Sequence, residues 1–243
     1  MGDYLPLFDR FHVPSSASRL MDEFAEVVLD KDFPCFFARS AHRRGELLYG
    51  FADVSSNFWP VVQLFDAAVR AIGDDGERTI IMWVINSSSA SLEEDHRFTA
   101  RIMEFLLHND PLPWPEGVPL DPADPEWDFW YRGVGFFINV STPHHVLRRS
   151  RNLGSAYTLV VQARSSFTEI DQKWGNARGS IRSMVEKYDL LPLSPALGVH
   201  GEKAEIDQFF LGDDNETCVS GSLLKNIEYK NRGGEVRCPL HRD

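Results

Sequence analysis

The sequence has few cysteines and little positive charge for its length. Only Cys35, Cys218 and Cys238 occur among 243 residues, and no two of them form a CxxC pair. Three cysteines leave one thiol unpaired in any disulfide scheme, which favours a reducing compartment, so we expect a cytoplasmic protein. The net charge is −11. Nucleic acids and anionic membranes attract positive charge, so neither is an expected partner.

Long apolar runs are also missing. No 18 consecutive residues are apolar, and residues 1–6 contain no basic segment leading into an apolar one, so we expect neither a transmembrane helix nor a secretory signal. The chain is nevertheless 43% hydrophobic, with 17 Phe and 6 Trp. That content can fill a sizeable core, and flat aromatic side chains commonly line pockets for flat apolar ligands.

Helical and strand patterns alternate along the chain. Apolar residues at helical spacing predict helices at about 17–30, 60–73 and 91–108, and a broken helix at 170–188. Apolar and β-branched runs predict strands at 33–38, 47–52, 79–85, 127–131, 136–140 and 157–162, with a hairpin turn at Gly133–Gly135. Six prolines predict a long loop over 110–125, and the polar tail to Asp243 is expected to be largely irregular.

No repeat or flexible linker divides this pattern. Because strands and helices are interleaved, we predict one α+β domain over residues 1–243, with helices packed on a mixed β-sheet.

Cys35 lies in the apolar run 33–38 and has two interpretations. A cysteine beside Phe33, Phe36 and Phe37 is most often inert core filling. The functional alternative is an iron ligand, because a thiolate in water-poor surroundings can hold haem iron and donate electron density that favours O–O cleavage. The cysteine alone does not decide between them.

Histidines and arginines gather in one short segment. His144 and His145 are adjacent and point in different directions on any regular element, so at most one is expected to face a given site. No other His or Cys completes a zinc-ligand spacing, which leaves metal hydrolysis a minor alternative. Arg148, Arg149 and Arg151 are either a solvated basic face or a clamp for carboxylates, such as haem propionates or the carboxyl group of an amino acid.

Aromatic and acidic side chains alternate after the proline-rich loop, at Trp127, Asp128 and Trp130. An aromatic wall with one carboxylate could hold a cation through cation–π attraction and charge-assisted hydrogen bonds. Core packing with an edge aspartate explains the same residues. Residues 213–215 are likewise either a turn or a second acidic contact.

Taken together, these segments resemble the YqcI/YcgG family. The resemblance runs through Phe33–Cys35, Trp127–Tyr131, Phe136–Asn139, Pro143–His144, Arg148–Gly154 and Gly212–Asn215. It therefore spans most of the chain, and it is most specific in the Arg-Arg-Ser-Arg-Asn-Leu-Gly string that begins at Arg148.

The resemblance implies a haem b enzyme that N-hydroxylates guanidine compounds. Cys35 would be the iron ligand, and Phe36 would lie beside the haem. Arg148, Arg149 and Arg151 would contact a carboxylate of the haem or of the substrate.

The same resemblance implies a guanidine or amine substrate, held by Trp127, Asp128 and Trp130. Asp128 and His144 would be the catalytic residues, and O2 or peroxide would supply the oxygen. The sequence has no GxGxxG after a strand and no CxxC cluster, so a separate electron donor is expected. A homodimer is one oligomeric state left open. The alternative function is a haem-binding or sensing protein without turnover.

Overall fold

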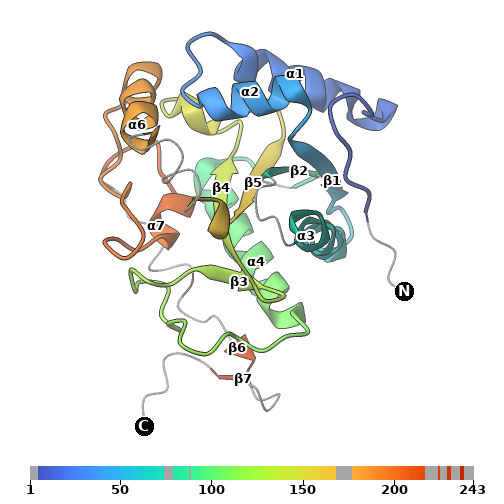
Figure 1. Ribbon diagram of the computed structural model, residues 1–243, viewed down its shortest axis with the longest axis vertical. Helices are drawn as coiled ribbons and strands as arrows, with labels where there is room; N and C mark the ends of the chain where they lie inside the picture. Colours follow the sequence, from blue (N-terminus) through green and yellow to red (C-terminus); the bar gives the residue numbers. More distant parts are fainter. Residues whose placement is uncertain are drawn as a thin grey trace.

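The computed structural model describes residues 5–73, 79–87, 89–167, 177–216, 224, 229–230 and 236–237. A five-stranded sheet lies at its centre, in the order β1-β2-β5-β4-β3 (Figure 1). These strands are β1 Leu48–Asp53, β2 Thr79–Ile85, β3 Phe129–Tyr131, β4 Val134–Ser141 and β5 Tyr157–Ala163. Strands β1 and β2 are parallel, and the other neighbours in this sheet are antiparallel. The predicted α+β fold class with a mixed sheet is confirmed.

Helices pack on both faces of the sheet. They are η1 Ser15–Ala17, α1 Ser18–Leu29, α2 Phe36–Arg44, α3 Trp59–Ile72, α4 Leu92–Asn109, η2 Arg149–Arg151, α6 Ala177–Tyr188 and α7 Ile206–Phe209. A separate pair of short strands, β6 Tyr229–Lys230 and β7 Val236–Arg237, forms a second sheet. Among the residues that the structure describes, no helix is long and apolar enough to cross a membrane.

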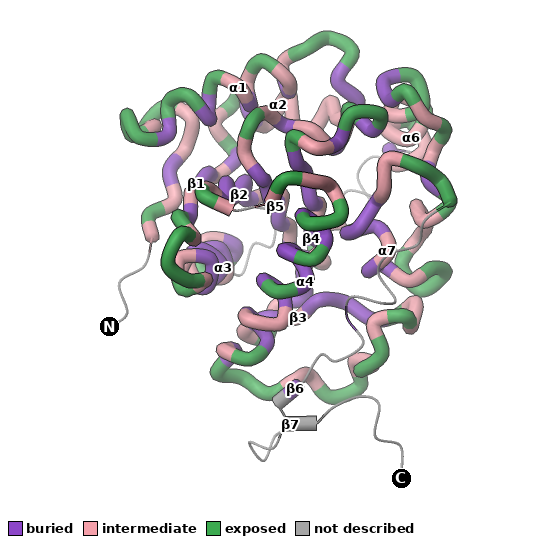
Figure 2. The backbone as a smooth tube through the Cα atoms, turned by 180° about the vertical axis from the view of Figure 1, so that it is seen from behind, coloured by how far each residue is buried: buried purple, intermediate pink, exposed green. Residues whose placement is uncertain are grey.

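Strand β2 shows how the sheet divides the core. Because successive side chains of a strand point to opposite faces, Ile80 and Met82 belong to the cluster formed with α3 and α4. Ile81 and Trp83 belong to the cluster formed with α1 and α2. The strand predicted at 79–85 is confirmed; it is buried almost throughout and lies between β1 and β5. Figure 2 shows this buried centre and the exposed outer surfaces of the helices.

The hairpin between β3 and β4 turns at Arg132 and Gly133. Both residues have positive φ, 49° and 75°, which is the conformation of a two-residue type I′ turn. The predicted hairpin is confirmed, although Gly135 lies inside β4 and not in the turn. The side chain of Arg132 pairs with Asp66 of α3, and this ion pair connects the turn to α3.

The strand predicted at 33–38 is wrong. Residues 36–44 form α2, and Cys35 is its N-cap. A short apolar run does not distinguish a strand from the first turn of a helix. The helix continues through a polar segment with buried His42 on its inner side, and it ends at Gly45 with a φ of 73°.

Two further expectations concern the C-terminal third. The predicted helix is confirmed over α6, whereas residues 170–176 lie outside the described part of the chain. The tail is less irregular than expected, because α7, β6 and β7 lie within it. The tail is polar, and its strands have only two residues each, too few to show a periodic pattern.

Candidate functional site

Cys35 lies at the N-terminal end of α2. Its Sγ accepts a hydrogen bond from the backbone N–H of Ala38, 3.4 Å away. Free N–H groups and partial positive charge gather at this end of a helix. Burial raises the pKa of the Cys35 thiol, while the N–H groups of Ala38 and Phe37 act in the opposite direction. The free thiol is therefore protonated at neutral pH, but the same N–H groups would stabilise a metal-bound thiolate.

Aromatic rings flank Cys35 on both sides in the sequence. Phe33 is buried, and its ring meets the edge of Tyr188 at a centroid distance of 5.8 Å. The rings of Phe36 and Phe37 contact each other at 4.3 Å, and both residues are partly buried in the first turn of α2.

A cleft of about 320 Å³ opens beside this segment. It is lined by the turn between α1 and α2, by η2 and by the end of α6, through Asp30, Lys31, Asp32, Arg149, Met184, Lys187 and Tyr188. Cys35 is not among these residues. The two are nevertheless neighbours, because Asp32 precedes Cys35 by three positions and Tyr188 packs on Phe33. The cleft brings carboxylates and cationic groups together next to the thiol-bearing turn.

Arg148 is 2% exposed and joins two distant segments. Its guanidinium donates hydrogen bonds to the carbonyl oxygens of Gly212 at 2.5 Å and Asp214 at 3.0 Å, and to the Asn215 side chain. A fourth, longer contact reaches Pro192 O at 3.5 Å. The guanidinium nitrogens of Arg148 thus donate their hydrogen bonds to acceptors of the protein itself.

The other two arginines of the cluster have different surroundings. Arg149 is exposed, and its guanidinium lies over the Tyr188 ring at 4.6 Å on the wall of the cleft. Arg151 is 7% exposed, and its buried Nη1 has no hydrogen-bond partner among the described residues. The three arginines, close in sequence, thus differ in structure. Arg148 joins two segments, Arg149 lines the cleft, and Arg151 is buried with an Nη1 that no described residue contacts by a hydrogen bond.

His144 and His145 each pair with a different aspartate. His144 Nδ1 lies 2.7 Å from Asp95 Oδ2, and His145 Nδ1 lies 2.7 Å from Asp213 Oδ1. Asp95 is buried in the first turn of α4, and His144 keeps 31% of its side chain exposed. Its ring is therefore oriented by a carboxylate yet open to solvent, which is the arrangement of a proton-transfer group.

Asp213 holds the loop that carries these residues. Burial acts to raise its pKa, but hydrogen bonds from His145 and from the backbone N–H groups of Leu147, Arg148 and Val146 outweigh burial and keep the pKa well below its usual range. Residues 213–215 were predicted to be a turn or an acidic contact. Asp213 instead accepts hydrogen bonds from backbone N–H groups of the loop at 146–148 and so has a structural role.

His42 is a buried residue of α2 that sequence reasoning missed. Its Nδ1 lies 2.7 Å from the Tyr49 hydroxyl, and in the part of the chain that the structure describes its buried Nε2 has no hydrogen-bond partner. Burial first, and then Arg10 and Arg43, lower its pKa to about 4, so the imidazole is neutral. The only signal in the sequence is a histidine on the apolar side of a helix, which usually means core packing.

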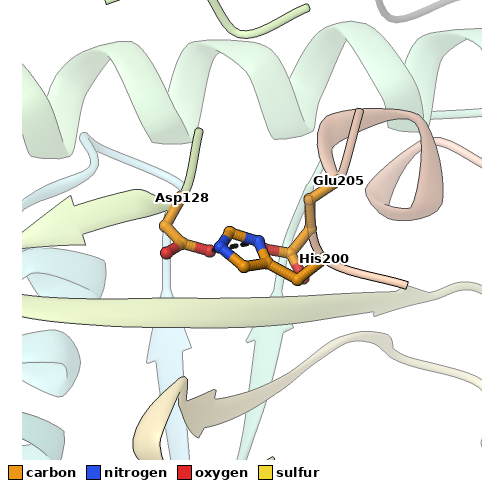
Figure 3. A group of neighbouring side chains, drawn as sticks. All are labelled: Asp128, His200 and Glu205. Atoms are coloured by element: carbon orange, nitrogen blue, oxygen red, sulfur yellow. Dashed lines mark ion pairs between the residues drawn. The ribbon is translucent and has the colours of Figure 1, made fainter. Parts of the chain in front are cut away.

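A second polar cluster surrounds Asp128. The side chains of Asp128, His200 and Glu205 point toward one another, with potential ligand atoms all within 4.8 Å (Figure 3). Arg164, just after β5, places Nε 3.0 Å from Asp128 Oδ1 and Nη2 2.5 Å from Glu205 Oε1. Burial, helped by a hydrogen bond with Asp128, raises the pKa of Glu205. The group has the ligand types of a metal site, but Arg164 already supplies it with a cation.

The aromatic neighbours of Asp128 pack into the core. Trp127 is fully buried, stacks on Trp114 and donates its indole N–H to the Tyr229 hydroxyl at 3.1 Å. Trp130 is partly buried against Gly135. The strand β3 that follows Asp128 and the helix α2 lie toward opposite ends of the long axis (Figures 1 and 2). The structure therefore does not bring Trp127, Asp128 and Trp130 together with Cys35.

The chain belongs to the YqcI/YcgG family, whose model matches residues 24–221. A Streptomyces lavendulae protein provisionally named N(omega)-hydroxy-L-arginine synthase DcsA is 30% identical over 211 residues, covering 80% of this chain and 78% of its own. Two Bacillus subtilis (strain 168) proteins named only as uncharacterized also match. YcgG is 30% identical, with 80% and 83% covered, and YqcI is 26% identical, with 82% and 84% covered. No solved structure matches the chain.

Proposed function

We propose that this protein is a haem-dependent enzyme that N-hydroxylates a guanidine compound, with arginine as the first substrate to test. Two facts support the proposal. A relative that matches most of the chain carries a name for this reaction on arginine. The observation that carries it is Cys35 at the start of α2, where its Sγ accepts a backbone N–H.

The residues around Cys35 fit a thiolate ligand of haem iron. Backbone N–H groups at a helix N-terminus favour the negative sulfur, and hydrogen bonds to sulfur tune the iron. Phe33 and Phe36 provide aromatic surfaces beside it. When bound there, haem supplies the activation of O2 or peroxide, and an external donor supplies two electrons if O2 is used.

The chain's own residues would bind and orient the substrate at the cleft. Asp30 and Asp32 place two carboxylates on its wall, and carboxylates form charge-assisted pairs with a guanidinium. Holding the guanidinium near the thiol-bearing turn removes part of the entropic barrier to reaction. His144, oriented by Asp95, can accept or donate a proton. The cation is assigned to this cleft because Asp128 is distant and already paired with Arg164.

The test begins with the absorption spectrum of the purified protein, with and without dithionite and CO. We expect haem in the wild type, and loss of haem or a shifted ferrous–CO band in Cys35→Ala, which removes the sulfur and spares most packing. Cys218→Ala is the matched control and should retain the wild-type spectrum. An unchanged ferrous–CO spectrum in Cys35→Ala excludes this ligand, and His42→Ala then tests the other buried donor of α2.

Turnover is tested by titrating the ferric protein with arginine and related guanidines. Mass spectrometry of mixtures with reductant and O2, or with peroxide, should show a product heavier by one oxygen atom. A haem protein whose spectrum no guanidine perturbs, and which forms no such product, contradicts the enzyme proposal. That result would favour haem binding or sensing without turnover.

A further inference from the structure

Arg151 carries a buried charge without a counter-ion among the described residues. Its side chain is 7% exposed, and Nη1 has no hydrogen-bond partner. No carboxylate of the described residues pairs with this nitrogen. The acid that acts on it is Asp189, but the two oxygens of Asp189 accept hydrogen bonds from Ser150 N at 2.7 Å and Ser150 Oγ at 2.9 Å.

The surroundings of Arg151 are positive. Burial, and then repulsion by Arg148, lower its pKa to about 10, and Arg151 in turn acts on buried His145. The carboxylate of Asp213 is already used by His145 and by three backbone N–H groups. A buried N–H group of a cation without an acceptor is unfavourable, so among the described residues an acceptor is missing beside Nη1.

The backbone holds Arg151 where it is. Its N–H donates to Arg148 O at 2.8 Å, and its carbonyl oxygen accepts the N–H of Thr142 at 2.9 Å, just after β4. Arg148 is itself anchored by the segment around Gly212. The backbone of η2 is thus held by hydrogen bonds on both sides of Arg151, which limits how far the base of its side chain can move.

We propose that Arg151 binds a carboxylate group that is buried with it. The identity of the ligand rests on the proposed function: the carboxylate is a propionate of haem or the carboxyl group of an amino-acid substrate. The planar fork of arginine suits a carboxylate. Arg148 cannot take this role because its donors are used, and Arg149 is exposed and stacked on Tyr188. The link from η2 toward the thiol-bearing turn runs through Arg149, which lies over Tyr188, and through Tyr188, which packs on Phe33.

The test compares Arg151→Met with the wild type, and Arg97→Met is the control. Arg97 is an exposed arginine that pairs with Glu93 on α4. Methionine keeps an unbranched apolar stem, although it is shorter than arginine, and it removes the charge. If the ligand is haem, the rate at which hemin is lost to apomyoglobin should be at least about tenfold higher for Arg151→Met than for the wild type. If the ligand is the substrate, the dissociation constant for arginine should be at least about tenfold higher. Either change is the size expected when a charge-assisted contact is lost. Arg97→Met should bind the ligand as tightly as the wild type, and Arg151→Lys should restore little of the lost binding.

Two ligand pairs identify the source of the carboxylate. If Arg151 binds a propionate, its defect disappears when hemin dimethyl ester replaces hemin. If it binds the substrate, the defect disappears when agmatine, which is arginine without its carboxyl group, replaces arginine. The proposal is overturned if Arg151→Met weakens binding equally for hemin and its dimethyl ester and equally for arginine and agmatine. It is also overturned if Arg151→Met weakens the binding of none of these ligands.

Ligand-free protein separates this proposal from the proposed function. Replacing an uncompensated buried charge by a neutral side chain should leave the melting temperature unchanged or raise it. Acetate, compared with chloride at equal ionic strength, should stabilise the wild type and not Arg151→Met, even if the protein binds neither haem nor guanidines. A clearly lower melting temperature for Arg151→Met, together with equal responses of both proteins to acetate, shows that Arg151 has only a structural role.

Discussion

The anchoring of Arg148 predicts a large loss of stability in Arg148→Met. The substitution keeps an unbranched apolar stem but removes the buried donors that now reach Gly212, Asp214 and Asn215. Each charge-assisted hydrogen bond contributes about 1.5–3 kcal/mol, but such contributions do not add within one network. The substitution leaves three acceptors of partly buried hydrogen bonds without their donor, at about 1–3 kcal/mol each, so we expect a total cost of about 3–5 kcal/mol. The free energy of unfolding of an ordinary domain is only about 5–15 kcal/mol, so this loss is a large fraction of it.

Urea denaturation followed by circular dichroism measures the effect. With a denaturant slope of about 2–3 kcal/mol/M, the midpoint should fall by about 1–2 M. Arg149→Met is the matched control, because Arg149 is exposed and its ring contact with Tyr188 is worth about 0.5–1 kcal/mol. If Arg148→Met is no less stable than Arg149→Met, the network between the arginine segment and Gly212–Asn215 does not stabilise the protein.

Two further predictions concern the folded state. Burial lowers the pKa of His42 and of His96 to about 4, below the usual value of about 6.5. As the pH falls from about 6.5 to 4, the unfolded chain therefore binds protons that the folded chain does not, and the free energy of unfolding should decrease. If the urea midpoint does not change as the pH falls from about 6.5 to 4, this pH dependence is wrong. Gly133→Ala should cost about 1–2 kcal/mol because φ there is 75°, and an unchanged melting temperature would exclude the type I′ turn.

Local signals in the sequence were enough for most of the secondary structure. Ser91 and Glu94 predict the start of α4, and the structure confirms that Ser91 Oγ accepts the Glu94 N–H and that Glu94 accepts the Ala90 N–H. The buried strand β2 and the α+β class follow from apolar runs in the same way. The start of α2 was predicted wrongly because its first residues form a short apolar and aromatic run, which does not distinguish a strand from the first turn of a helix.

The sequence by itself determined the fold class, the family and a short set of residues able to carry chemistry. Tertiary structure alone decided what each of them does. His144 and His145 are adjacent, yet their aspartates lie 49 and 68 residues away. Arg148 and Arg151 are chemically identical, yet the described residues surround one with acceptors and leave Nη1 of the other without a hydrogen-bond partner. The physical reason is that ionic and hydrogen-bonding energies depend on distance and burial, and both are set by segments that meet only after folding.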